Sequence, residues 1–200
     1  MTKQRTALGL ALVTAACLGP ATAASAASAG TAPAHGSAHG PVRLAGFARL
    51  DPRTPTPDTS DRLTLAVDAR TDRAADPASG RGHATIQHLF RNPDGSWQGT
   101  VRIDVSIDCL TTSGPTATVT GTVDSLTFTV PPGQQQPPRA AAGWHPETGF
   151  TFSLGGPEAG RIGWTGTPDY RDPSAPPVAT RCRATPPTFY LVNGGFAVSR

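Results

Sequence analysis

The stretch "VRIDVSIDC", residues 101–109, limits the possible folds of this chain more than any other. Apolar side chains occupy its odd-numbered positions, from Val101 to Cys109, and polar side chains occupy the positions between them. Successive side chains of a strand point to opposite faces, so this alternation predicts a β-strand with one buried and one solvated face. We place Cys109 on the buried face, pointing inward at the end of the strand.

A turn and a second alternating run precede this strand. The turn is "NPDG", residues 92–95, in which Pro93 presets its own φ and Gly95 tolerates a positive φ. Residues 83–90 alternate before it, so residues 83–109 are predicted to form a β-hairpin.

The rest of the chain also contains short runs that are typical of β-strands. Further strands are expected at 42–50, 63–68, 117–130, 149–154, 161–165 and 188–198. Glycine (22) and proline (21) are frequent, whereas the chain has a single methionine and few other strong helix formers. These features predict an all-β fold, an antiparallel β-sandwich or β-barrel of about eight or nine short strands, and periodicity does not choose between the two.

The N-terminus has the pattern of a secretory signal peptide. Lys3 and Arg5 precede an apolar run at 7–19, and small residues follow it. The expected cleavage follows Ala23, Ala26 or Ala29. The predicted organisation is a signal peptide at 1–29, a disordered tail at 30–40 and a single β domain at 41–200.

Cys17 leaves a second interpretation of this segment open. The preceding "VTAAC" resembles a bacterial lipobox, in which Cys17 would carry a lipid anchor, but Thr14 stands where leucine is usual. Several cleavage sites lie downstream, so we expect Cys17 to leave with the signal peptide. No later stretch is apolar enough to cross a membrane, and the mature protein is expected to be secreted, extracellular or associated with the cell wall.

Cys109 and Cys182 are the two cysteines that remain after cleavage. An even count in an exported chain predicts one disulfide, which would fix a late loop to the core. The alternative is a free nucleophilic thiol.

Charge argues against nucleic acid as a partner. Removing Lys3 and Arg5 lowers the formal net charge from +3 to +1, and the remaining arginines are scattered along the chain. A phosphate-tracking stripe is therefore not expected. We expect a monomer with an extracellular or cell-wall ligand.

Residues that could carry catalysis or bind a metal do not form a recognisable site. Asp104 and Asp108 share a strand face, but their Cα atoms would lie about 13 Å apart, whereas paired glycosidase carboxylates need roughly 5 to 9.5 Å. We expect them on a solvated face beside Arg102. His83 and His88 fall on opposite faces of one strand and cannot share a metal. Nucleophile-elbow and phosphate-loop motifs are absent, so no cofactor, metal or catalytic residue is assigned.

Aromatic residues suggest a binding site. Trp97 begins the central strand beside a turn, and Trp144 and His145 lie in the loop "GWHPETG". Exposed aromatic faces stack on sugars or apolar ligands, so these three residues are the predicted ligand contacts. The alternative is that the tryptophans pack in the core, which we expect for Trp164.

The stretch "VSIDCLTTSGPTATVTGTV" resembles a group of exported actinobacterial proteins labelled repetin-like. The resemblance is strongest over residues 83–123, in the strand with His88, the tryptophan after the turn and the core from Ile107 to Gly121. The remainder, which holds the late cysteine, matches only in its plan. It implies a secreted β domain with a cysteine pair. The group has no defined activity, so the resemblance implies no catalytic residue.

The resulting hypothesis is a secreted, disulfide-stapled β domain that acts as a non-catalytic binding or cell-envelope module. The alternative is a small secreted hydrolase with a dispersed site, in which His145 would work with an acid. A third hypothesis is an inhibitor of secreted proteases that presents the loop "PPGQQQPP", residues 131–138.

Overall fold

A computed structural model describes residues 40–51, 62–92, 94–166 and 179–200. The predicted signal peptide, the tail up to residue 39 and the possible lipid anchor at Cys17 lie outside the described residues. The described residues all belong to one compact unit, His35–Arg200. None of them forms a helix that is long and apolar enough to cross a membrane.

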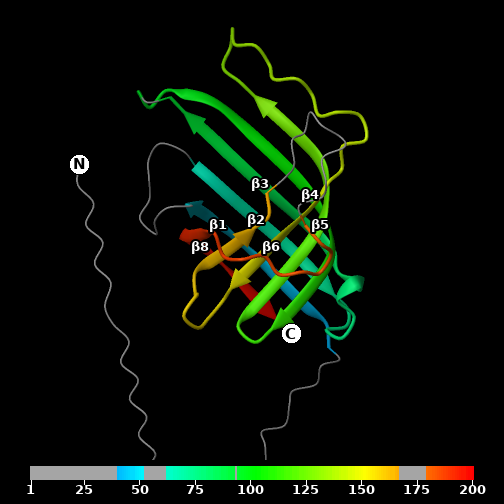
Figure 1. Cartoon of the computed structure of the whole chain (residues 1–200). Coiled ribbons are helices and arrows are strands. Elements are labelled where there is room, and N and C mark those ends of the chain that lie inside the picture. The colour runs from blue at the N-terminus through cyan, green and yellow to red at the C-terminus, as the bar shows by residue number, and fades with distance from the viewer. Residues whose placement is uncertain (1–39, 52–61, 93, 167–178) are drawn as a thin grey trace, which may run out of the picture. The chain divides into compact units, whose positions relative to one another are not determined.

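Eight strands of the described part form one closed antiparallel barrel (Figure 1). They are β1 (Val42–Asp51), β2 (Arg62–Thr71), β3 (Arg81–Arg91), β4 (Trp97–Ser113), β5 (Thr116–Thr129), β6 (Glu147–Ser153), β7 (Arg161–Trp164) and β8 (Phe189–Ser199), with a short 3-10 helix η1 (Pro77–Ser79) between β2 and β3. Each strand pairs with the next along the chain, and β8 pairs with β1. The all-β prediction is confirmed, and the barrel is the one of the two expected architectures that forms.

Alternating side chains fill the barrel. The strands β1 to β7 each contribute buried residues to the core, whereas the apolar side chains of β8 are partly buried and pack against it. The largest fully buried side chains of the interior are Phe150, Phe152, Leu44, Leu65, Leu110 and Ile162. The interior is therefore a packed core.

The predicted hairpin of residues 83–109 is confirmed by β3 and β4. Ile86 lies opposite Ile103, and His88 lies opposite Val101. At the turn, the Gly95 N–H donates to the Asn92 carbonyl oxygen at 2.8 Å, and Gly95 has a φ of 82°.

The predicted orientation of Cys109 is wrong. The register of β4 and β5 shifts between Ile107 and Cys109, so that Ile107 lies opposite Gly121 and Cys109 lies opposite Thr120. The extra residue, Asp108, forms a β-bulge, which reverses the alternation. Cys109 therefore faces outward with Thr120, and its side chain is nonetheless fully buried.

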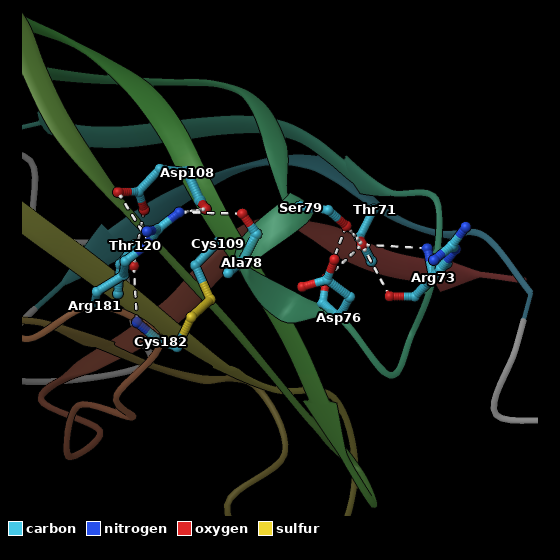
Figure 2. Close-up of a disulfide and its surroundings, with 10 residues drawn as sticks. All are labelled: Thr71, Arg73, Asp76, Ala78, Ser79, Asp108, Cys109, Thr120, Arg181 and Cys182. Atoms are coloured by element: carbon cyan, nitrogen blue, oxygen red, sulfur yellow. Dashed lines mark hydrogen bonds and ion pairs between the residues drawn. A yellow bond between two sulfur atoms is a disulfide. The ribbon is translucent and has the colours of Figure 1, made fainter.

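A strap covers Cys109 on the outside of the barrel. The strap comprises residues 179–188, which lead into β8. Cys182 forms the predicted disulfide with Cys109, across a Cα–Cα distance of 5.5 Å. Figure 2 shows this bond, with Arg181 donating hydrogen bonds to the carbonyl oxygens of Ala78 and Asp108.

Threonines hold the strap against β5 and β6. The Cys182 N–H donates to Thr120 Oγ1 at 3.0 Å, and the Thr185 N–H donates to Thr151 Oγ1 at 2.8 Å. Thr118, Thr120, Thr151 and Thr185 are all buried although they lie outside the barrel core. The strap thus creates a second buried layer.

The strap leads to the weakest seam of the barrel. Between β7 and β8 only Arg161 with Tyr190 and Ile162 with Phe189 are paired, although β1 and β8 pair along nine positions. The disulfide at Cys182 lies just before β8 in the chain. It therefore anchors β8, which pairs with β7 over only a short stretch.

Candidate ligand-binding cleft

The long strand β5 extends beyond its neighbour β6. Residues Thr116–Thr122 of β5 pair with β6, but the following residues pair only with β4. The chain after β5 folds back over this region as the roof loop, residues 131–146, and rejoins it where the Val123 N–H donates to the Pro146 carbonyl oxygen at 3.0 Å (Figure 1).

A cleft of about 400 Å³ lies between this end of the barrel and the roof loop. Its lining comprises Phe90, Gln98, Gly99, Thr100, Val101, Phe128, Thr129, Val130, Gln134, Gln135 and Pro137. Phe90 lies opposite Gly99 in one strand pair, and Val101 lies opposite Phe128 in the next, which makes an apolar floor across β3, β4 and β5.

Glutamines surround that floor. Gln98 lies at a register shift of β4, the kind of bulge that turns a side chain out of the regular alternation. Gln134 and Gln135 approach from the roof loop. Each amide offers both a donor and an acceptor, and none of the described residues that line the cleft is charged.

A second hollow, of about 620 Å³, lies on the other side of the roof loop. It shares Phe128 and Pro137 with the cleft and adds Ser125, Leu126, Thr127, Gln136, Arg139 and Ala140.

Trp144 and His145 anchor the roof loop. Trp144 is only 6% exposed and belongs to the core cluster, and its backbone N–H donates to the Ala141 carbonyl oxygen. His145 Nδ1 lies 2.9 Å from the Val123 carbonyl oxygen. These two predicted ligand contacts do not line the cleft; they hold its roof.

Trp97, the third predicted ligand contact, does not line the cleft either. Its side chain is exposed, and its Nε1–H donates to Thr100 Oγ1 at 3.3 Å. Thr100 is a lining residue, so Trp97 is linked to the cleft only through this hydrogen bond. No sequence pattern marks Phe90, Phe128 or the glutamines as a site, because only the register of three strands and the fold of the roof loop bring them together. Trp164 packs against the core, as expected.

Asp104 and Asp108 lie in separate networks on the outer face. Asp104 accepts hydrogen bonds from Arg102, from Thr85 at 2.9 Å and from Ser125 at 3.1 Å. The hydrogen bond from Arg102 is the largest cause that holds the pKa of Asp104 below its usual value. Asp108 lies 3.4 Å from Arg181 of the strap.

The histidines of β3 are separated as predicted. His83 lines a polar hollow on the outer face, whereas the His88 ring packs on Phe90, with ring centroids 3.9 Å apart. Among the described residues, no three His, Cys, Asp or Glu side chains gather as a possible metal site.

Comparison with known proteins finds no relative of this chain. No family model, no curated protein and no solved structure matches the chain.

Proposed function

We propose that this protein is an exported binding module that holds a neutral, hydroxyl-rich ligand, such as a cell-wall saccharide, in the cleft beneath the roof loop. The observation that carries the proposal is an uncharged cleft with an aromatic floor and an amide rim, at the end of a barrel whose interior is packed.

The composition of the cleft suits that class of ligand. Phe90, whose ring also packs on His88, and Phe128 contribute aromatic rings to the lining, which suits the apolar faces of a sugar. The amides of Gln98, Gln134 and Gln135 match hydroxyl groups as donors and acceptors. The volume of about 400 Å³ is within the range of small-molecule sites. A charged ligand would find no partner among the described lining residues.

Export is supported by the sequence and by the disulfide. The N-terminal pattern is that of a signal peptide, and the repetin-like resemblance implies the same destination. A disulfide such as Cys109–Cys182 persists in oxidising compartments.

The test is a titration of the secreted protein with oligomers of N-acetylglucosamine, followed by calorimetry and by tryptophan fluorescence. Calorimetry is the primary readout, because Trp97 does not line the cleft and can report binding only through its hydrogen bond to Thr100. Phe90→Ala and Gln135→Ala should each weaken binding about tenfold or more, a loss of about 1.4 kcal/mol.

The matched control is Gln87→Ala, which removes an exposed glutamine of β3 that does not line the cleft. It should leave the affinity unchanged. The proposal fails if none of these oligomers binds, or if the Gln87 variant weakens binding as much as the Gln135 variant does.

A further inference from the structure

Three arginines stand side by side on the outer face of the barrel. Arg43 of β1 lies directly opposite Arg70 of β2, and Arg70 lies directly opposite Arg81 of β3. Neighbouring strands are about 4.8 Å apart, so the row spans about 10 Å. Like charges directly opposite each other destabilise a sheet, so this arrangement has a cost that the fold alone does not require.

Two carboxylates form ion pairs with the arginines at the two ends of the row, Arg43 and Arg81, and neither forms one with Arg70 at its centre. Asp68 accepts from Nε and Nη2 of Arg43 at 2.8 and 2.7 Å, and both oxygens of Asp72 lie 2.7 Å from Nη2 of Arg81. No hydrogen bond or ion pair joins the Arg70 side chain to a described residue, although its charge acts on Asp68. The row therefore has one positive charge in excess, at its middle.

A hollow of about 580 Å³ opens over this row. It is lined by Arg43, Asp68, Arg70, Arg81, Gly82 and His83, and the side chains of Arg43 and Arg81 are 57% and 48% exposed. The hydrogen bond from Arg43 is the largest cause that lowers the pKa of Asp68, and the charges of Arg43, Arg70 and His83 act in the same direction. The three arginines thus outnumber the two carboxylates of Asp68 and Asp72, which leaves this group of side chains with an excess of one positive charge.

Each arginine keeps hydrogen-bond donors for a ligand. Among the described residues, the ion pairs leave Nη1 of Arg43, Nε and Nη1 of Arg81 and the whole guanidinium group of Arg70 without a partner. The planar fork of arginine binds phosphate oxygens in pairs. The row thus offers several N–H groups to a tetrahedral anion centred over Arg70.

We propose that the Arg43–Arg70–Arg81 row is an anion site that binds the phosphate groups of a phosphodiester polymer outside the cell. This site is separate from the saccharide cleft: Arg81 and Phe90 lie nine residues apart on β3, about 30 Å along the strand. The polymer is favoured over a single anion because its regularly spaced charges can remain near the three guanidinium groups at once.

The experiment titrates the full secreted protein with a glycerol-phosphate oligomer and, in parallel, with inorganic phosphate, at about 20 and about 200 mM salt. The oligomer should bind, and its affinity should fall with salt because phosphate contacts release counterions. Arg70→Gln should weaken binding at least tenfold. Arg62→Gln, at the other end of the same strand and outside the hollow, should leave it unchanged.

The arms of the experiment separate the sources of phosphate. Tighter binding of the oligomer supports the polymer, whereas equal binding of inorganic phosphate overturns it in favour of a site for the free anion. The proposal is also wrong if neither probe binds at low salt, or if both arginine variants lose affinity equally. Arg70→Gln should leave saccharide binding intact, so failure at one site is distinguishable from failure at the other.

Discussion

Trp144 connects the roof of the cleft to the barrel core. Its indole is buried, but its Nε1–H has no hydrogen-bond partner among the residues that the structure describes. A buried donor without a partner costs about 1–3 kcal/mol, so the packing of the ring must outweigh that cost.

Two substitutions separate these contributions. Trp144→Ala should lower the free energy of unfolding by about 3–5 kcal/mol, because it removes a large buried side chain. Trp144→Phe should cost much less, because it keeps an aromatic ring and deletes the unpaired N–H. Urea denaturation followed by circular dichroism measures both, and equal losses would show that the indole does not act through packing.

Asp104 should make stability depend on pH. Hydrogen bonds from Arg102, Thr85 and Ser125 hold the pKa of Asp104 below that of an unfolded chain, about 3.9. Its contribution is therefore complete above the unfolded-state pKa and is lost as pH falls through the lower folded-state pKa.

Asp104→Asn should consequently destabilise the protein at pH 7, by no more than about 1 kcal/mol because the pair is partly exposed. The difference from the unmodified protein should shrink as the pH falls below about 3.9 and through the lower folded-state pKa of Asp104. Denaturation curves at pH 7 and over a series of acidic pH values measure this, and a difference that stays constant over the series would contradict the assignment.

Gly121 is required by the close approach of β4 to β5. A Cβ at this position would meet the Ser106 backbone oxygen, beside the bulge that redirects Cys109. Gly121→Ala should therefore destabilise the protein by about 1–3 kcal/mol or more. Gly195→Ala is the control, because a Cβ there meets nothing within 4 Å. Thermal unfolding compares the two, and the account of the bulge fails if Gly121→Ala is as well tolerated as Gly195→Ala.

Among the elements, the strap has the largest predicted effect on stability. The disulfide joins residues 73 positions apart, for which the chain-entropy model gives about 4 kcal/mol. Cys109→Ala/Cys182→Ala should lose about 2–4 kcal/mol and should speed amide exchange most in β7 and β8, whose pairing is short. Reductant should destabilise the unmodified protein and leave the double variant unchanged. Uniform exchange across the barrel would contradict the role of the strap.

The strand positions could be predicted from alternation, but the bulges could not. In β5 the better-covered positions change from odd numbers, such as the buried Val123, to even numbers, such as the half-buried Leu126 and Phe128, and the register shift at Asp124 accounts for this change. A bulge depends on the partner strand, and one strand's sequence does not contain that partner. The error in the orientation of Cys109 has the same cause.

For the whole molecule, the sequence left open whether the strands form a closed barrel or a sandwich. Eight alternating strands suit a sandwich as well as a barrel, and the pairing of β1 with β8 decides between them. That pairing joins the two ends of the described chain, so no local pattern encodes it. The cleft and the arginine row depend on the same long-range register, which is why scattered arginines and unassigned glutamines become two candidate sites.

The main proposal is that this chain is exported and folds as one barrel that the Cys109–Cys182 disulfide cross-links. Its most direct test is the intact mass of the protein recovered from the culture medium, before and after reduction, with a peptide map of the unreduced form. We predict that the recovered protein begins directly after Ala23, Ala26 or Ala29 and that its mass rises by a pair of hydrogens on reduction. The unreduced form should yield two peptides linked through Cys109 and Cys182. Two free thiols, or a lipid-bearing mass that begins at Cys17, would contradict the account.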